Sequence, residues 1–186
     1  MKKYVIAAII GAFSALTLSG CGGGGGGGGT PPTATKAIST VYLFNAISSN
    51  RIATVQTTIT VPSGVMVNYS SPPGAISGIF PLRSGFVVPS GPVRISATDI
   101  SGNYDTSSGT LLISMVNIER ADLRSGKIGS GTEIAQINFK LVTPGVLPVL
   151  PTPWQYTLVV GQESSPTDPR PTVMSGCNLN FATTYQ

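Results

Sequence analysis

The sequence contains no histidine, and this absence limits the chemistry that the protein can perform. A Ser-His-Asp or Cys-His mechanism needs an imidazole base, and most catalytic zinc sites use at least one histidine. Attachment of a c-type haem needs Cys-x-x-Cys-His. None of these sites can be built from this chain. Glycoside hydrolysis needs only two carboxylates, so the composition alone does not exclude it.

Charged residues are also scarce. They make up 10% of the 186 residues, against about 25% in an average domain. Lys2 and Lys3 stand at the extreme N-terminus, and the rest of the chain holds nine Lys or Arg and seven Asp or Glu. No basic patch is present, so we expect no nucleic-acid partner. The composition is typical of extracellular β domains, in which Ser, Thr, Asn and Gly cover the surface.

The N-terminus has the layout of a secretory signal peptide. Lys2 and Lys3 precede residues 4–18, "YVIAAIIGAFSALTL", which hold no charge. This apolar segment is shorter than the roughly 20 residues that a membrane-spanning helix needs. The tetrapeptide "LSGC" at 18–21 resembles the bacterial lipobox. That resemblance implies a diacylglyceryl group on the Cys21 thiol, cleavage before Cys21 and acylation of the new amino group.

The expected lipid on Cys21 predicts where in the cell the protein is located. Stable anchoring takes two membrane signals, and two or three acyl chains on one residue supply them. The residue after Cys21 is Gly22 and not an aspartate, which resembles the outer-membrane sorting pattern of Gram-negative lipoproteins. We therefore expect a protein anchored in the cell envelope, and in the outer membrane if the cell is Gram-negative, with no cofactor besides this lipid. The alternatives are an ordinary cleaved signal peptide with a chance cysteine, or an uncleaved anchor.

A linker separates this anchor from one domain. The eight glycines at 22–29 predict a flexible coil that spans about 16 Å. "TPPTATK" at 30–36 adds a stiffer, extended piece. The sequence thus predicts a signal peptide at 1–20, a lipidated cysteine and linker at 21–37, and a domain at 38–186.

The domain is predicted to be all-β. In "ATVQTTITV" (53–61) and "TEIAQINFKLV" (132–142), apolar and polar residues alternate, which is typical of half-buried strands. Further expected strands are "VYLFNAI", "PVRISATD" (92–99), "TLLISMVNI" (110–118), "YTLVV" and "NLNFATTY". The stretch at 110–118 is more continuously apolar and predicts an inner strand. Turn formers separate these segments, among them "SSPPG", "DISGNYD" and "SSPTDPRP", and "IERADLRSG" is compatible with one helical turn. We expect an antiparallel, jelly-roll-like sandwich of two sheets with about nine strands.

The order of these segments resembles cohesin-type domains and the wider group of carbohydrate-binding-module-like sandwiches. The best local match is "KIGSGTEIAQINFKLV" (127–142), which resembles a Gly-rich turn followed by a cohesin strand. "TTITVPSGVMV" (57–67) and "GPVRISATDISG" (91–102) resemble earlier parts of that domain. The resemblance implies a non-catalytic module for protein–protein binding or assembly. The alternative is a carbohydrate-binding module for envelope or extracellular polysaccharide. No dockerin-contact residue can be mapped onto this chain.

One segment has the oxygen spacing of a calcium loop. The alternating side chains are those of Asp99, Ser101, Asn103 and Asp105. However, Tyr104 stands where an EF-hand needs glycine, and Thr110 where it needs a bidentate glutamate. The alternative is a polar hairpin loop, and we expect no metal.

One carboxylate pair is a candidate acid/base couple. Glu119 and Asp122 lie beside Arg120 and Arg124. Such clusters are more often solvated ion pairs, worth under about 1 kcal/mol each. We therefore expect no catalytic residue and no enzyme.

Aromatic residues are the candidates for a sugar-binding surface, foremost Trp154 and Tyr156, with Tyr42, Tyr69 and Tyr104 as further candidates. The alternative is that these rings belong to the core. With Cys21 lipidated, Cys177 has no partner within the chain. It is then an inert buried thiol, a residue that forms an intermolecular disulfide, or a reactive thiol.

Overall fold

Alternation of apolar and polar residues produces eleven strands in the described part of the chain. The computed structural model describes residues 33–46, 51–91, 96–116, 131–165 and 168–186. The strands are β1 (Lys36–Phe44), β2 (Ile52–Thr60), β3 (Val65–Met66), β4 (Ile79–Pro81), β5 (Val87–Pro89), β6 (Ile100–Asp105), β7 (Thr110–Val116), β8 (Thr132–Leu141), β9 (Tyr156–Ser165), β10 (Asp168–Met174) and β11 (Asn178–Tyr185). One 3₁₀ helix, η1 (Ala97–Asp99), precedes β6.

Several predictions concern residues outside these ranges. They are the signal peptide at 1–20, the lipidated Cys21, most of the linker and the helical turn in "IERADLRSG". The same holds for the pair Glu119 and Asp122 with their neighbouring arginines. These remain predictions from the sequence.

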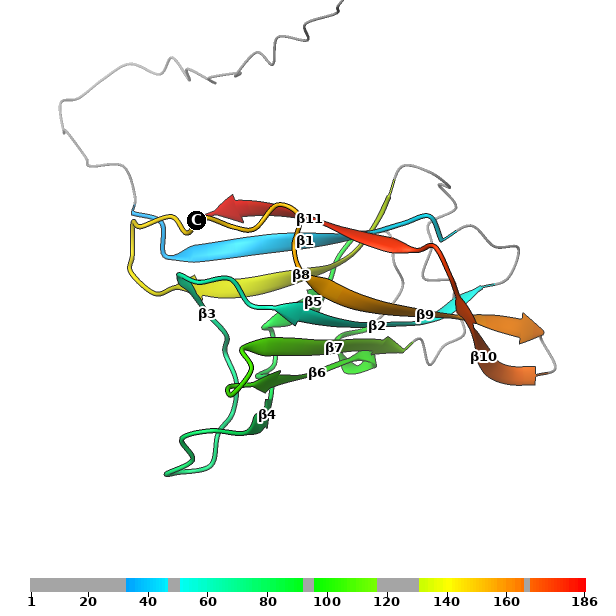
Figure 1. Ribbon diagram of the computed structural model, residues 1–186, viewed down its shortest axis with the longest axis horizontal. Helices are drawn as coiled ribbons and strands as arrows, with labels where there is room; N and C mark the ends of the chain where they lie inside the picture. Colours follow the sequence, from blue (N-terminus) through cyan, green and yellow to red (C-terminus); the bar gives the residue numbers. More distant parts are fainter. Residues whose placement is uncertain (1–32, 47–50, 92–95, 117–130, 166–167) are drawn as a thin grey trace, which may run out of the picture. The chain divides into compact units, whose positions relative to one another are not determined.

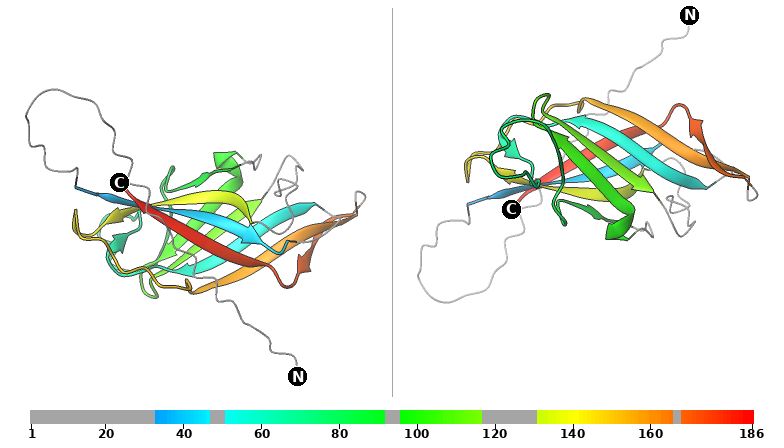
Figure 2. Two further views of the ribbon diagram at one scale, coloured as in Figure 1. Left: turned by 90° about the horizontal axis from the view of Figure 1, so that it is seen from above. Right: turned by 90° about the horizontal axis from the view of Figure 1, so that it is seen from below.

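The strands form two antiparallel sheets (Figure 1). Sheet A has the order β11-β1-β8-β3, and β5 also pairs with β8. Sheet B has the order β10-β9-β2-β7-β6-β4. Seen from above, β11, β1 and β8 lie in front of sheet B, and seen from below β2, β7 and β9 lie in front (Figure 2). The predicted antiparallel sandwich of two sheets is confirmed. The described residues form eleven strands where about nine were expected, and three of them, β3, β4 and β5, have only two or three residues each.

The core lies between the inner faces of the two sheets, as the alternation predicted. On β2, Val55, Thr57 and Ile59 are buried. On β8, Ile137 and Phe139 are buried among others, while Lys140 points to solvent. The stretch at 110–118 provides β7, an inner strand between β2 and β6. Alternate β7 residues are fully buried and those between them are mostly half-buried.

Two register shifts move residues inward that simple alternation would not place there. A shift between Ile52 and Thr54 in the β2–β9 pair buries Ile52, whereas Ala53, predicted to point inward, is half-buried. A second shift, in the β1–β8 pair between Val41 and Tyr42, leaves the consecutive β8 residues Ile134 and Ala135 both buried. Such bulges insert one extra residue and re-aim the side chains around it.

Three segments differ from the sequence-based expectation. The end of the predicted strand 92–99 is instead helix η1; residues 92–95 lie outside the described ranges. Alternation along "PVRISATD" would turn Ala97 inward with the other apolar residues, but Ala97 is exposed. "DISGNYD", predicted as a turn, contains strand β6. The proline-rich "SSPTDPRP", also predicted as a turn, contains the start of β10. Because β10 is an edge strand, its prolines need not donate to a ladder on both sides.

The chain enters sheet A slightly earlier than expected. Strand β1 begins at Lys36, so Lys36 and Ala37, assigned to the linker, belong to the strand. Thr35 and Lys36 both donate their N–H to the Gln186 carbonyl, which ties the start of β1 to the end of β11. No helix within the described residues is long and apolar enough to cross a membrane.

Candidate functional site

The two foremost aromatic candidates lie beside the inner face of edge strand β11. Trp154 is 8% exposed and stacks on Phe181 of β11, with ring centroids 4.7 Å apart. On its other side the Trp154 ring lies 6.2 Å from Phe139, which meets Phe86 edge-on at 5.5 Å. Trp154 is therefore part of an aromatic row that extends from β11 into the core.

Tyr156 closes part of the open edge of β11. Its hydroxyl accepts a hydrogen bond from the Leu179 N–H at 2.9 Å and donates one to the Leu179 C=O at 3.1 Å. Its ring also lies 5.9 Å from that of Phe181. The Tyr156 hydroxyl thus takes the place of a neighbouring strand at this one residue.

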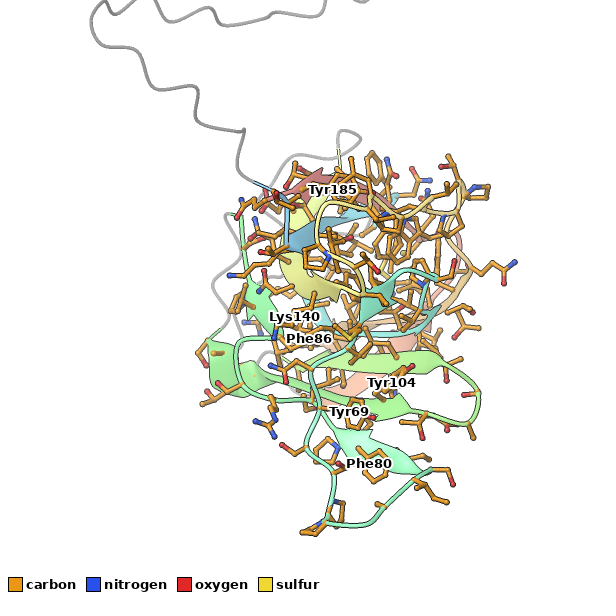
Figure 3. The ribbon with its side chains drawn as sticks, turned by 90° about the vertical axis from the view of Figure 1, so that its left-hand side faces the viewer. Tyr69, Phe80, Phe86, Tyr104, Lys140 and Tyr185 are labelled. Atoms are coloured by element: carbon orange, nitrogen blue, oxygen red, sulfur yellow. The ribbon has the colours of Figure 1, made fainter. Side chains whose placement is uncertain are left out.

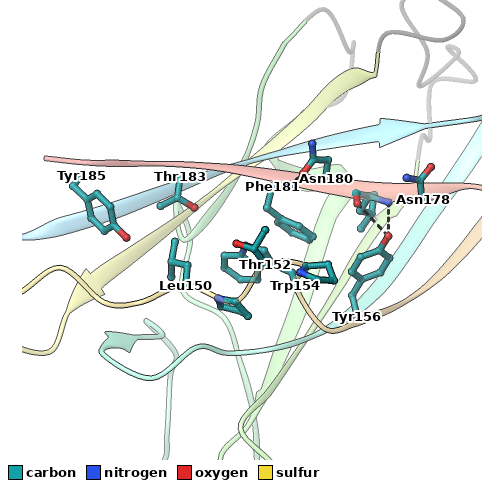
Figure 4. A pocket seen from close by; sticks show the side chains of 12 residues that line it. Leu150, Thr152, Trp154, Tyr156, Asn178, Asn180, Phe181, Thr183 and Tyr185 are labelled. Atoms are coloured by element: carbon teal, nitrogen blue, oxygen red, sulfur yellow. Dashed lines mark hydrogen bonds between the residues drawn. The ribbon is translucent and has the colours of Figure 1, made fainter. Parts of the chain in front are cut away.

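A groove of about 410 Å³ runs between β11 and the segment that precedes β9 (Figure 4). It is lined by apolar, amide and hydroxyl side chains: Leu150, Pro151, Thr152, Pro153, Trp154, Tyr156, Asn178, Leu179, Asn180, Phe181, Thr183 and Tyr185. None of these residues carries a formal charge at neutral pH. The groove combines an aromatic floor with polar groups along one strand.

The outer edge of β11 exposes unpaired backbone groups beside this groove. The N–H of Gln186 donates to Lys36 of β1, whereas the backbone of Leu179 faces away from β1. Because the direction alternates along a strand, the backbones of Phe181, Thr183 and Tyr185 also face away from β1. Phe181 donates its N–H to its neighbour's side chain, Asn180 Oδ1, at 2.8 Å. Within the described residues, the outward N–H and C=O groups of Thr183 and Tyr185 have no hydrogen-bond partner.

The other sheet edges in the described part of the chain are protected in ways that β11 is not. Strands β3, β4 and β5 have only two or three residues each. Strand β10 begins with "DPRP", which provides both charge and proline. Natural proteins protect edges by shortness, charge and proline. Strand β11 has eight residues, "NLNFATTY", with neither charge nor proline.

A second aromatic cluster lies against sheet B. Tyr69 stacks on Phe80 of β4 at 5.4 Å and meets Tyr104 of β6 at 5.3 Å (Figure 3). Phe80 is buried and both tyrosines are half-buried. Burial raises the pKa of the Tyr104 hydroxyl, with smaller contributions from Tyr69 and Asp105. Tyr42 lies apart from this cluster, half-buried on β1.

The calcium candidates follow one another along η1 and β6 instead of surrounding one point. Asp99 ends η1, where its carboxylate accepts hydrogen bonds from the Ser96 N–H at 2.8 Å and hydroxyl at 2.9 Å. Ser101, Asn103 and Asp105 follow at alternate positions on β6. Alternate strand residues lie about 7 Å apart, whereas calcium ligands all lie within 2.3–2.6 Å of the ion.

The Asp105 carboxylate is hydrogen-bonded to residues of the turn that follows it. It accepts hydrogen bonds from the Ser107 N–H at 2.8 Å, the Ser107 hydroxyl at 2.6 Å and the Ser108 hydroxyl at 2.8 Å. These bonds lower the pKa of Asp105 from 3.8 to about 2. The residue stabilises the turn between β6 and β7.

The described glutamates are also engaged locally. Glu163 forms an ion pair with Arg51, and Glu133 accepts a hydrogen bond from the Ser90 hydroxyl at 2.5 Å. Within the described ranges, no three His, Cys, Asp or Glu side chains come close enough together to hold a metal ion.

Cys177 is an unpaired, half-buried thiol just before β11. Its Sγ lies 3.8 Å from the Asn45 carbonyl oxygen. Burial raises the pKa of this thiol, which lowers the fraction of reactive thiolate.

The groove as a whole was not predicted from the sequence, although two of its residues, Trp154 and Tyr156, were named as candidates. The available signal was the uncharged segment "SGCNLNFATTYQ" (175–186), which alone does not indicate an edge strand. Comparisons of the chain with protein-family models, with curated proteins and with solved structures found no match.

Proposed function

We propose that this is a lipid-anchored envelope protein whose non-catalytic β-sandwich binds another protein. An extended segment of the partner pairs with the outer edge of β11 and places side chains in the groove beside it. Strand addition of this kind takes affinity from backbone hydrogen bonds and specificity from pockets for alternate side chains.

The observation that carries this proposal is the unprotected edge of β11. Thr183 and Tyr185 offer four outward backbone groups in a strand that has no charge or proline to repel a partner. The adjoining groove supplies apolar contact through Phe181 and Leu150.

The aromatic geometry favours a protein over a polysaccharide. A sugar platform needs exposed, coplanar rings, but the Trp154 ring is buried by stacking on Phe181. The Tyr156 hydroxyl, a natural donor to a sugar, is already bonded to Leu179. Polysaccharide binding is therefore the second candidate, and it depends on the half-buried Tyr69 and Tyr104.

The anchor is supported by the sequence around Cys21. The lipobox-like tetrapeptide stands between an apolar segment and eight glycines, the order that a tethered domain needs. The function needs no cofactor besides the lipid. The cohesin-like resemblance agrees with a non-catalytic binding module and stays a prediction.

Site-specific photocrosslinking in cells tests the binding surface. A photoreactive residue replaces Ala182, which is exposed on β11, and in a control strain it replaces Val173, which is 73% exposed on β10. We expect a discrete protein adduct from position 182 and none from 173. Adding Thr183→Pro removes an outward N–H that β1 does not use, so the adduct at 182 should be lost. Thr183→Ala is the control: it loses the same hydroxyl bond to the buried Ser39 but keeps the outward N–H, and it should retain the adduct.

Two results would overturn the assignment: adducts at 182 that contain glycan but no protein, or protein adducts that Thr183→Pro leaves unchanged. Circular dichroism of the purified variant checks its fold. The anchor is tested separately, because Cys21→Ser should move the chain out of the membrane fraction of cells. Retention of Cys21→Ser in that fraction with its leader uncleaved would contradict the lipid anchor.

A further inference from the structure

An exposed aliphatic segment follows strand β8. The side chains of Val142, Val146, Leu147 and Val149 are 55, 60, 54 and 91% exposed. No charged residue occurs between Lys140 and Glu163. Single exposed apolar residues are normal, but several in one segment mark an interaction site.

This segment is held firmly to the domain. Thr143 to Val146, "TPGV", forms a turn closed by the Val146 N–H and the Thr143 carbonyl at 3.1 Å. Gly145 has φ +79°, which suits the third position of a type II turn with proline before it. The Gly145 N–H donates to the Ala34 carbonyl at 2.8 Å, and the Tyr185 hydroxyl donates to the Pro148 carbonyl at 3.1 Å.

Two lysines lie close to this segment on the outer face of sheet A. Lys36 of β1 is directly opposite Lys140 of β8, and both are exposed. Met66 of β3, 43% exposed, is the next residue in the same row across the sheet. Like charges directly opposite each other destabilise a sheet. Among the described residues neither lysine forms an ion pair, so nothing there offsets this repulsion.

The same end of the domain receives the chain from the predicted anchor. Strand β1 begins there and β8 and β11 end there (Figure 1), and Lys140 and Tyr185 are seen at this end in Figure 3. Thr33, the first described residue, is twelve residues after Cys21. The eight glycines span about 16 Å and an extended piece of four residues adds about 12 Å at most, so a lipid anchor would hold this end near the bilayer.

We propose that this end of the domain docks on the membrane surface, with Val146, Leu147 and Val149 entering the lipid interface. Lys36 and Lys140 contact anionic lipid headgroups. This inference rests on the lipid anchor of the proposed function. The occupant is a lipid surface because the patch joins aliphatic side chains to unpaired positive charge, the combination that binds anionic interfaces.

The tether lets a weak contact operate. A short flexible linker gives effective concentrations in the millimolar range, so a patch of a few side chains needs little intrinsic affinity. Docking would also fix the orientation of the domain, which the linker alone leaves undetermined.

The test uses the purified mature chain in vesicles of pure phosphatidylcholine or of phosphatidylcholine with phosphatidylglycerol. A polarity-sensitive fluorophore is attached to Leu147→Cys, or in the control to Val173→Cys on β10, which lies toward the other end of the domain in Figure 1. Both are made in a Cys177→Ser background. We expect a blue-shifted emission and a loss of iodide quenching at 147 on anionic vesicles, and neither change at 173.

Charge and apolar variants separate the two contributions. Lys36→Gln with Lys140→Gln should remove the difference between anionic and neutral vesicles. Val146→Ser with Val149→Ser should restore quenching at 147, whereas the matched Val173→Ser should not. Equal quenching at 147 and 173 on every vesicle would overturn the inference.

The mass of the purified chain keeps this result distinct from the proposed function. An acylated chain with an accessible residue 147 refutes docking and leaves the anchor intact. A chain without lipid refutes the anchor and, with it, the docking that rests on the anchor.

Discussion

The hydroxyl of Tyr156 bonds both backbone groups of Leu179 that face away from strand β1, at 2.9 and 3.1 Å. A side chain from the segment that precedes and opens β9 in sheet B thus completes an edge of sheet A. The open part of β11 begins only beyond this point. These two hydrogen bonds join sheet B to the edge of sheet A, and they leave only the part of β11 after Leu179 available to a partner.

Tyr156→Phe should destabilise the domain. It removes two hydrogen bonds to a buried residue, and leaving such groups unpaired costs about 1–3 kcal/mol. The free energy of unfolding in urea measures this. Tyr42→Phe is the matched control, because the Tyr42 hydroxyl makes no hydrogen bond within the described residues, and its effect should stay within about 0.5 kcal/mol. Equal effects of the two variants would contradict the role of Tyr156.

Trp154→Ala should be far more costly to stability. Trp154 is 8% exposed and stacks on Phe181, and removing a large buried ring typically costs about 3–5 kcal/mol. As the chain has a single tryptophan, its native fluorescence should be blue-shifted and should move to the red on unfolding. A variant as stable as the wild type would instead indicate a ring that serves a ligand.

Acid should weaken the contribution of Asp105 to the stability of the fold. Its pKa falls from 3.8 to about 2 on folding, because Ser107 and Ser108 donate to the carboxylate. A lowered pKa stabilises the fold above the unfolded value, and this contribution is lost as the pH falls from about 4 to about 2. The stability difference between wild type and Asp105→Asn should therefore shrink between pH 5 and pH 2. Urea unfolding at both pH values measures it, and a constant difference would refute the assignment.

Cys177 should react slowly with alkylating agents in the folded domain. Burial raises the pKa of its thiol, so at neutral pH less thiolate is present than in the unfolded chain. The rate of iodoacetamide modification, followed by mass in the presence and absence of urea, measures this. A native rate above the rate in urea would indicate an activated thiol instead of an inert one.

Much of the fold could be predicted from alternation along the sequence. The stretch "TEIAQINFKLV" has a clear period of two, and β8 buries the side that the pattern indicated. "NLNFATTY" coincides with β11. The failures occurred where local chemistry was ambiguous. "PVRISATD" alternates like a strand, but the Asp99 carboxylate bonds Ser96 and closes a turn of 3₁₀ helix.

The groove could not be predicted in the same way, because it depends on which strands end at a sheet edge. Trp154 and Tyr156 stood out only as large aromatic residues. Their partners, Phe181 and Leu179, are more than 20 residues away in sequence and meet them only after the two sheets pack together.

The sequence by itself determined the strand periodicity, the scarcity of charge, the exclusion of histidine chemistry and the predicted anchor at Cys21. These are local properties, since side-chain type and spacing decide them without reference to distant residues. Only the tertiary structure decided that β11 lies unprotected at an edge, that Trp154 is buried, and that Lys36 faces Lys140. Each of these depends on strand order and register, which are set by the burial of one whole face against another and not by any single segment.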